Sequence, residues 1–174
     1  MPIYSFEGRR PKIDASAWVF PNAVIIGDVT LGREVYVGAG AILRGDYGSI
    51  EVGDGSAIEE GVIIHARPED RTSIGRNAML GHGAMVHNAV IEDDAVIGMR
   101  AVVSDYSRVG EWAIIGEGGL VRNNQIVPPR TVALGVPVKV VGDIKENHIQ
   151  MWTWAKELYR GLARRYPAGL ERID

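Results

Sequence analysis

An aliphatic residue returns about every six positions along most of this chain, starting at Ile26. The later positions are Leu31, Val37, Leu43, Val52, Ile58, Ile64, Ile74, Leu80, Val86, Ile91, Ile97, Val103, Val109, Ile115, Val121 and Val127. Most steps are six residues, two are five, and two are lengthened by insertions at residues 47–49 and 67–70. A sustained hexapeptide period is typical of a β-helix, in which three six-residue units of strand and corner close one coil. The pattern therefore predicts an all-β fold, a parallel β-helix of stacked coils.

This repeat also predicts which side chains share an edge of the prism. Residues eighteen apart stack in adjacent coils, about 4.7–4.9 Å from one another. His65 and His87 each follow the aliphatic residue of their repeat and are 22 positions apart, which is eighteen plus the four inserted residues. Arg44 precedes His65 by 21 positions, which is eighteen plus the other three. We expect these three side chains to stack in one column.

His82 belongs to a different corner, because it lies two positions past the aliphatic residue of its repeat. A metal held by His65 and His87 would therefore receive His82 from a neighbouring chain. Glu60 is 22 positions before His82 in the same register, so it should stack beneath His82 and meet Arg44 of the neighbour. The spacing predicts a homotrimer with metal sites between subunits and an Arg44–Glu60 ion pair across each interface.

The three clustered histidines carry the candidate chemistry. A lone histidine in a β-helix corner is usually a surface residue, and we interpret His148, on the polar side of a predicted helix, in that way. For His65, His82 and His87 the alternative to a metal site is a metal-free structural cluster. Three histidines leave the fourth tetrahedral position of zinc open to water, which is the catalytic arrangement rather than the structural one.

The domain organisation follows from where the repeat stops. Residues 1–142 are expected to form the β-helix domain, with an irregular lead-in containing a short strand at residues 3–6 and a crossover at 130–142. The prolines at 128 and 129 should end the ladder, because proline has no N–H to donate. Residues 143–166 should form a helix, with Asp143 and Glu146 as a capping box. Its buried stripe is predicted to be Ile149, Trp152, Leu158, Leu162 and Tyr166. Residues 167–174 form a tail.

Composition narrows the function classes. The net charge of −3 argues against a nucleic-acid partner, which would favour a basic stripe. The absence of cysteine means that any metal must be bound through nitrogen and oxygen. No apolar run approaches the ~18 residues of a membrane span, and the N-terminus lacks the apolar region of a signal peptide. We therefore expect no membrane association and a cytoplasmic protein.

Five motifs together resemble the γ-class carbonic anhydrase family, in particular its short bacterial members, which include accessory proteins of phenylacetate degradation and carnitine operons. They are LRGD at residues 43–46, IEEGVIIH at 58–65, GHGAMVH at 81–87, IGM at 97–99 and LGVPVK at 134–139. This resemblance implies a left-handed β-helix, a hand that the general preference for right-handed crossovers would not give. It also implies a homotrimer that binds Zn²⁺, or alternatively Fe²⁺ or Co²⁺, through His65 and His87 of one chain and His82 of the next.

The activity implied by the resemblance is hydration of CO₂ to bicarbonate by a metal hydroxide, a carbonate dehydratase (lyase) reaction. Arg44 resembles the family arginine that binds bicarbonate and pairs across the interface, although Glu60 replaces the usual aspartate. Asp46 matches the second member of the family's RxD motif and would hold hydrogen bonds in the site, or alternatively serve as a turn residue. Tyr159 matches a helix tyrosine near the metal, but Ala155 replaces the preceding asparagine, so simple helix packing is the alternative.

Two departures from the family pattern favour slow hydration or a related hydrolysis. Glu59 replaces the glutamine that orients the metal hydroxide, and its charge would raise the pKa of the bound water and oppose bicarbonate binding. The acidic loop that carries the proton shuttle is missing, with Tyr47 in place of its first glutamate and Glu69 and Asp70 as nearby substitutes.

Two further classes of function remain open. Hexapeptide acyltransferases share the repeat, the trimer and a terminal Gly-x-Pro segment, and they bind acyl-CoA between subunits with one catalytic histidine and no metal. A metal hydroxide in the same cleft could instead hydrolyse an acyl-CoA thioester. The third possibility is a catalytically silent assembly or scaffold subunit. Retention of all three histidines argues against the acyltransferase, whereas Glu59 keeps the scaffold open.

Overall fold

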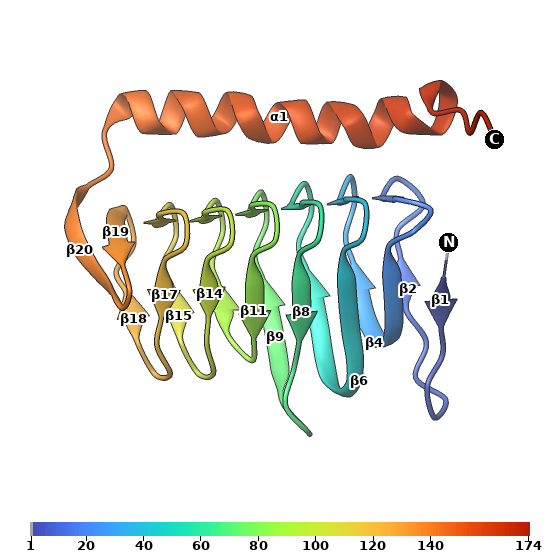
Figure 1. Ribbon diagram of the computed structural model, residues 1–174, viewed down its shortest axis with the longest axis horizontal. Helices are drawn as coiled ribbons and strands as arrows, with labels where there is room; N and C mark the ends of the chain where they lie inside the picture. The colour runs from blue at the N-terminus through green and yellow to red at the C-terminus, as the bar shows by residue number, and fades with distance from the viewer. Residues whose placement is uncertain (1) are drawn as a thin grey trace.

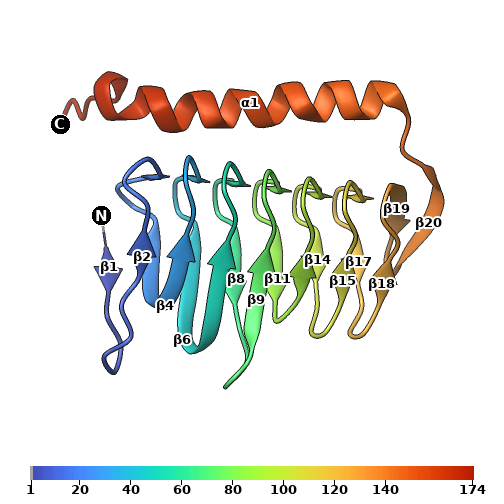
Figure 2. The same cartoon turned by 180° about the vertical axis from the view of Figure 1, so that it is seen from behind.

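A computed structural model describes residues 2–174 as a parallel β-solenoid with one long helix, α1 (Glu146–Gly169), lying along its side (Figure 1). The helix runs back over the coils, so that its C-terminal end lies near the end of the solenoid where β1 begins (Figure 2). The predicted all-β fold with a C-terminal helix is confirmed. No helix in residues 2–174 is long and apolar enough to cross a membrane.

Each coil contributes one strand segment to each of three faces. The helix face, beneath α1, contains β3 (Trp18–Val19), β5 (Tyr36–Val37), β7 (Ala57–Ile58), β10 (Met79–Leu80), β13 (Val96–Ile97), β16 (Ile114–Ile115), β19 (Thr131–Gly135) and β20 (Val138–Asp143). The bare face contains β1 (Ile3–Tyr4), the first halves of β4 (Val24–Leu31) and β6 (Ile42–Val52), β8 (Ile63–His65), β11 (Met85–His87), β14 (Val102–Val103) and β17 (Leu120–Val121). The polar face contains β2 (Lys12–Ile13), the second halves of β4 and β6, β9 (Arg71–Ile74), β12 (Val90–Ile91), β15 (Arg108–Val109) and β18 (Ile126–Val127). The long strands β4 and β6 bend from the bare face onto the polar face.

The hexapeptide aliphatic residues fill the interior, where every one except Ile26 is buried. Leu43, Ile64 and Val86, for example, are fully buried and stack on one another through the pairing of β6, β8 and β11. Because side chains alternate across a strand, the residue on either side of each aliphatic position points outward. This alternation is what places Arg44, His65 and His87 on the outside of the prism.

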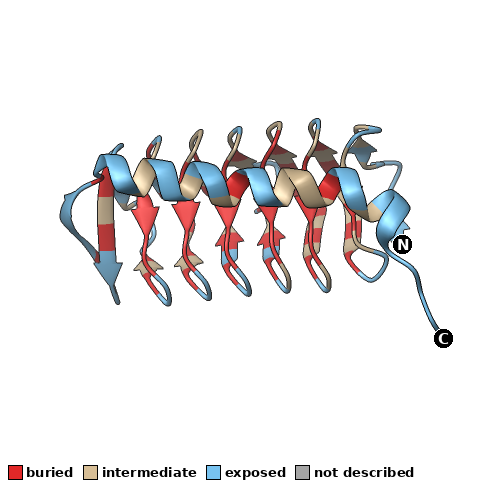
Figure 3. Ribbon diagram, turned by 90° about the horizontal axis from the view of Figure 1, so that it is seen from above, coloured by how far each residue is buried: buried red, intermediate tan, exposed pale blue. Residues whose placement is uncertain are grey.

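The outward side chains give the three faces different surfaces. On the helix face they are mostly large and apolar, and they pack under α1, where the strands are buried (Figure 3). On the polar face the outward positions include Thr30, Glu51, Ser73 and Arg108. On the bare face they form a continuous apolar column of Val24, Ile42, Ile63, Met85, Val102 and Leu120. This column is not covered, since Ile63 is 37% and Met85 41% exposed.

Three corners connect the faces. We call the corner between the bare and polar faces the histidine corner, since His65 and His87 lie there with the two inserted segments. The corner between the helix and bare faces is the His82 corner, which also holds Glu59 and Glu60. The outer corner joins the polar face to the helix face. The bare face is therefore bordered by the histidine corner on one side and the His82 corner on the other.

The end of the solenoid differs from the prediction. We expected Pro128 and Pro129 to end the ladder, but β19 pairs in parallel with β16, and β20 then pairs antiparallel with β19. The two prolines lie in the corner after β18, where their missing N–H groups interrupt no strand pairing. The segment predicted as a crossover therefore contains one more parallel strand and a reversing strand.

Both ends of the predicted helix also move. Asp143 is the last residue of β20, paired with Thr131, so the N-cap is Lys145 and the predicted capping box is wrong. The backbone N–H of Lys145 donates to His148 Nδ1 at 3.1 Å, which gives His148 a role in capping the helix. The helix continues through Pro167 to Gly169, three residues further than predicted.

The buried stripe of α1 is also partly different. Leu158 is 45% exposed, because a six-residue step from Trp152 does not match the 3.6-residue period. Lys156, Tyr159 and Ala163 face the solenoid instead. The Lys156 ammonium lies 3.2 Å from Asp94 Oδ1, donates to the Asp94 carbonyl at 2.7 Å and sits over the Trp112 ring, which ties the helix to the outer corner.

Candidate metal centre

His65 and His87 are directly paired neighbours on β8 and β11, and Arg44 of β6 is the partner of His65 on the other side. The column predicted from the spacing is therefore confirmed. The two imidazole rings lie 5.1 Å apart between centroids, and His65 Nδ1 is 3.1 Å from His87 Nε2.

Each imidazole is held through its other nitrogen by a carboxylate. His65 Nε2 lies 3.0 Å from Asp46 Oδ1, and His87 Nδ1 bonds Asp105 Oδ1. With these nitrogens donating, His65 Nδ1 and His87 Nε2 both present lone pairs to the same point. Two nitrogen ligands bound tetrahedrally at 2.0–2.1 Å would lie about 3.3 Å apart, close to the separation seen here. The donor set and spacing therefore fit two ligands of one divalent metal.

Arginines hold both carboxylates in their charged form. Arg44 Nη1 donates to Asp46 Oδ2 at 2.7 Å, and Arg67 Nη1 bonds Asp105 Oδ2. Burial opposes ionisation of both aspartates, but the hydrogen bonds from the arginines and histidines outweigh it, so the pKa of each carboxyl is below its ordinary value. Burial also lowers the pKa of His65, which favours the neutral imidazole that a metal requires. Asp46 thus bonds both Arg44 and His65, as the sequence suggested. Its role in a metal site stays a prediction.

Sequence reasoning did not identify Asp105 or the part played by Arg67. Asp105 lies one coil beyond His87, but that coil is one residue short: Val86 pairs with Val103, so the residue that directly follows the aliphatic position is Ser104. Asp105 is one position further into the corner. Arg67 lies in the second inserted segment and reaches across a coil to Asp105. The register therefore places Asp105 next to the histidine column and not in it, and an inserted loop gives no register for the side chain of Arg67.

His82 lies apart from the other histidines, at its own corner, as predicted. His82 Nδ1 is 2.7 Å from Glu60 Oε2, and Nε2 is 3.1 Å from Glu59 Oε2. Glu60 also accepts a 2.7 Å hydrogen bond from the Tyr36 hydroxyl. Within residues 2–174 of one chain, no group of three or more His, Cys, Asp or Glu side chains is placed to hold a metal. A complete three-histidine site would therefore need residues from more than one subunit.

Glu59 is almost fully buried beside His82. Its Oε2 atom accepts a hydrogen bond from the backbone N–H of His82 at 3.0 Å. Burial is the main cause that raises the pKa of Glu59, against the opposing effect of His82. Tyr159 lies at the same corner, where burial and then the Glu59 charge raise the pKa of its hydroxyl. Its ring also packs against Tyr36 at 5.2 Å, so Tyr159 has a packing contact as well as a place near Glu59.

The predicted ion pair between Arg44 and Glu60 is not formed within one subunit. Arg44 pairs with Asp46 of its own coil, and Glu60 is engaged by His82 and Tyr36. Both side chains remain partly exposed, Arg44 at 41% and Glu60 at 39%. The intersubunit pair stays a prediction.

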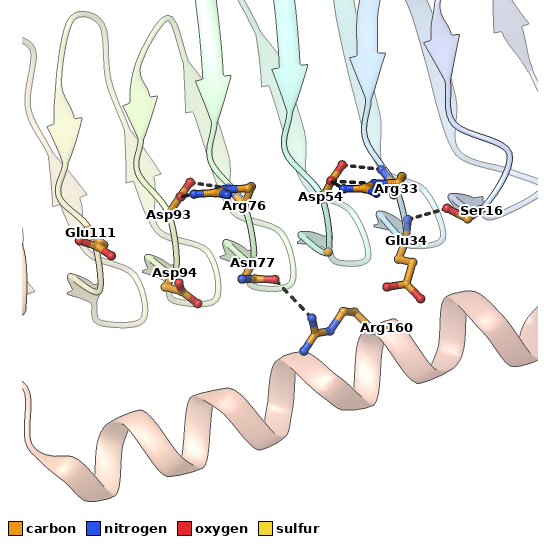
Figure 4. A pocket seen from close by; sticks show the side chains of 11 residues that line it. Ser16, Arg33, Glu34, Asp54, Arg76, Asn77, Asp93, Asp94, Glu111 and Arg160 are labelled. Atoms are coloured by element: carbon orange, nitrogen blue, oxygen red, sulfur yellow. Dashed lines mark hydrogen bonds and ion pairs between the residues drawn. The ribbon is translucent and has the colours of Figure 1, made fainter.

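A groove with a volume of about 720 Å³ lies elsewhere, between the outer corner and α1 (Figure 4). Two of its arginines pair with aspartates from the next coil, Arg33 with Asp54 at 2.7 Å and Arg76 with Asp93 at 2.6 Å. None of the predicted site residues lines it. These stacked ion pairs are solvated links between coils rather than a reactive site.

Comparison with known proteins agrees with the fold. Residues 10–45 and 71–105 match the family model described as bacterial transferase hexapeptide, six repeats. A hexapeptide transferase family protein from Anaplasma phagocytophilum is 30% identical, with 95% of this chain and 98% of that chain covered and a TM-score of 0.91. The chain belongs to the hexapeptide transferase family.

Two other relatives are informative about this family. A Bacillus cereus protein provisionally assigned as an acetyltransferase is 29% identical over 94% of this chain and 95% of its own, with a TM-score of 0.93. The carnitine operon protein CaiE of Escherichia coli O157:H7 is 44% identical over 81 residues. That match spans 47% of this chain and 41% of CaiE, so it covers less than half of the curated relative.

Proposed function

We propose that this chain forms a homotrimer with a divalent metal at each subunit interface and activates water there to attack a small carbonyl substrate, with CO₂ hydration as the reaction. The proposal rests on one observation, the 3.1 Å approach of His65 Nδ1 and His87 Nε2, each ring fixed by a carboxylate on its other nitrogen. Metal-binding histidines almost always donate their second N–H to such a partner.

The third histidine has the same arrangement. Glu60 bonds His82 Nδ1, just as Asp46 and Asp105 each bond one ring nitrogen of the other two histidines. His82 Nε2 is therefore the nitrogen that would bind a metal. That nitrogen is 3.1 Å from Glu59 in the isolated subunit, so binding to a neighbour's metal would require it to leave Glu59. Zn²⁺ fits this all-nitrogen donor set, and Fe²⁺ or Co²⁺ are alternatives.

When bound by three neutral imidazoles, such a metal would lower the pKa of a coordinated water to about 7 and so supply hydroxide at neutral pH. The chain's own residues do the rest. Arg44 is a partly exposed cation beside His65. In this proposal it would hold an anionic product such as bicarbonate. Glu59, freed from His82, is a buried carboxylate placed to accept a proton or a hydrogen bond at the same site.

The trimer itself is supported by the bare face. Its apolar column is flanked by the histidine corner on one side and the His82 corner on the other, so a threefold ring that buried this face would bring the two corners of neighbouring subunits together. A large exposed apolar patch on a soluble chain marks an interaction surface. The family resemblance gives the coil a left hand, which we adopt in the proposal.

Mixing two inactive variants tests the arrangement directly. His82→Ala trimers and His87→Ala trimers should each bind little Zn²⁺, because each lacks one ligand in every site. Trimers reassembled from both should regain metal where an intact His65–His87 pair meets an intact His82, and CO₂ hydration should return with it. His148→Ala, which changes a histidine at the helix N-terminus, is the matched control and should bind metal normally. Mixed trimers without recovered metal would contradict the cross-subunit site.

Acyl transfer is the second candidate, and the comparisons support it more directly than they support CO₂ hydration, since the family and its relatives are described as transferases. One contact also favours it. Asp105 holds His87 Nδ1, which leaves His87 Nε2 able to accept a proton from an attacking nucleophile, as a general base does. An acyl-CoA would be the acyl donor.

Metal removal separates these candidates. Acyl transfer from acetyl-CoA that persists after complete chelation and is lost in His87→Ala would establish the metal-free transferase. CO₂ hydration or acyl-CoA hydrolysis that disappears on chelation and returns with Zn²⁺ would establish the metalloenzyme. A trimer that binds metal and does neither would support the assembly subunit.

A further inference from the structure

Arg9 reaches the histidine corner from the opposite end of the sequence. Its Nη1 donates to the backbone carbonyl of Asp46 at 2.7 Å and to that of Tyr47 at 2.9 Å. One carbonyl belongs to the peptide that joins Asp46 to Tyr47, and the other belongs to the next peptide along the chain. No other side chain in residues 2–174 donates to either of them.

The hairpin that carries Arg9 is well fixed. Phe6 and Arg9 exchange backbone hydrogen bonds of 3.0 and 2.9 Å across a two-residue turn. Glu7 and Gly8 at the centre of this turn both have positive φ, 47° and 81°, as the tight hairpin turn of type I′ requires. The preceding strand β1 pairs with β4 of the first coil. The guanidinium is therefore presented from a short, anchored hairpin rather than from a free terminus.

The peptide that Arg9 holds determines where the Asp46 carboxylate lies. Asp46 Oδ1 accepts both the Tyr47 backbone N–H, at 3.0 Å, and the His65 ring nitrogen Nε2, also at 3.0 Å. Rotation of the 46–47 peptide would move the Tyr47 N–H away from the carboxylate and release it from His65. Arg9 opposes that rotation because it donates hydrogen bonds to the carbonyls of both Asp46 and Tyr47.

The same segment also contacts the second inserted loop. Ser49 donates its backbone N–H to the Asp70 carbonyl at 2.9 Å, and a Cβ on Gly48 would lie 2.3 Å from the Arg67 carbonyl. The two loops are thus packed backbone to backbone. Because Arg67 of this loop holds Asp105, the conformation of residues 46–48 is connected to both carboxylates that orient the histidine pair.

We propose that Arg9 is a positioning residue for the proposed metal centre: it locks the Asp46–Tyr47 peptide and thereby fixes the tautomer and orientation of His65. The inference rests on the proposed function for its consequence, which is metal affinity. Its immediate effect, on the ring of His65, can be measured without any metal. Among the hydrogen bonds and ion pairs of residues 2–174, none joins the Arg9 side chain to a histidine.

The test compares three variants. Arg9→Ala removes both hydrogen bonds. Arg10→Ala is the matched control, because the side chain of this adjacent arginine takes part in none of the hydrogen bonds or ion pairs found in residues 2–174. Arg9→Lys keeps a cation that can donate to the same carbonyls, so it should retain part of the wild-type tautomer preference of His65. It also keeps the test informative if Arg9→Ala loosens the hairpin.

The first readout is the ¹⁵N spectrum of selectively labelled histidines in metal-free protein, which distinguishes the two tautomers of His65. We expect the Nε2–H tautomer to dominate in the wild-type protein and in Arg10→Ala, a mixture of tautomers in Arg9→Ala, and an intermediate result in Arg9→Lys. Equal spectra for Arg9→Ala and Arg10→Ala would overturn the proposal.

The second readout is Co²⁺ binding, followed by its visible absorption. Arg9→Ala should weaken binding by about tenfold or more, the lower end of what outer contacts to metal ligands contribute, and should alter the band shape. If the tautomer changes in Arg9→Ala but even the wild-type protein binds no Co²⁺, the positioning role stands and the metal centre fails. Weakened binding with an unchanged tautomer would show that Arg9 acts by another route and would refute the inference.

Discussion

Asp105→Asn offers the sharpest single test of the histidine pair. The Asp105 carboxylate accepts from two donors, His87 on one oxygen and Arg67 on the other, and its side chain is only 12% exposed. An asparagine keeps the shape but has one oxygen, so its NH₂ group must face a donor whichever way it is turned. Either Arg67 loses its partner, or His87 must take the other tautomer and place a proton on Nε2, the nitrogen meant for the metal.

The expected cost follows from that geometry. Loss of a carboxylate that holds a metal-binding histidine typically weakens metal affinity by about 10- to 100-fold. This corresponds to about 1.4–2.7 kcal/mol of binding free energy. We expect Asp105→Asn to shift the Zn²⁺ dissociation constant by this factor, measured by competition with a chromogenic chelator at fixed pH.

Asp93→Asn is the control, because Asp93 also pairs with an arginine of a neighbouring coil, Arg76, but at the outer corner. It should leave the Zn²⁺ affinity unchanged. Thermal unfolding of both variants would show whether either has lost the fold. If the two folded variants bind Zn²⁺ equally well, Asp105 does not orient a metal ligand and the proposed centre is wrong.

Three other changes probe the interface, the helix and a corner. Met85→Lys on the bare face should weaken trimer association by on the order of a hundredfold, visible by sedimentation, whereas Ser73→Lys on the polar face should not. Burial lowers the pKa of Lys156 from 10.5 despite Asp94, so the unfolded state binds more protons. The unfolding free energy of the wild type should therefore rise relative to Lys156→Met as pH increases toward 10.5; parallel pH profiles in urea titrations would contradict this. Tyr106 has φ +59°, a left-handed conformation that asparagine adopts at lower cost than tyrosine. Tyr106→Asn should therefore raise the unfolding free energy by about 0.5 kcal/mol, and a lowered urea midpoint would contradict this.

The part of the fold that could be predicted is the part where one rule applies at every coil. Because each residue in a regular coil has its neighbour eighteen positions away, adding the inserted residues was enough to pair His65 with His87 and Arg44 with His65. The same rule, extended by one coil, gives Ser104 rather than Asp105, because the coil from Val86 to Val103 is one residue short. Contacts made by side chains from outside the repeat, such as Arg9 on the Asp46 carbonyl, have no period and could not be predicted.

Local signals failed where a larger element took precedence. Pro128 and Pro129 are strong breakers within a strand, but the chain places them in a corner, so the ladder gains another strand after them. Asp143 has the right side chain for a helix cap, yet it is the last residue of β20 and pairs there with Thr131 of β19. In both places the backbone hydrogen bonds of the sheet decided the outcome, because they bind every residue of a strand whereas a cap or a breaker acts at one position.

The antiparallel strand β20 bears on how this protein behaves at high concentration. A solenoid of parallel coils ends in a row of unpaired backbone groups that could accept another molecule end to end, and unchecked addition of this kind produces fibres. Here β20 reverses direction against β19, with a register irregularity at Val132–Ala133, before the chain turns away into α1. An incoming parallel coil would meet a strand of the wrong polarity at that end. On the helix face the reversal therefore opposes end-to-end addition of another parallel coil, whereas the bare and polar faces end at β17 and β18.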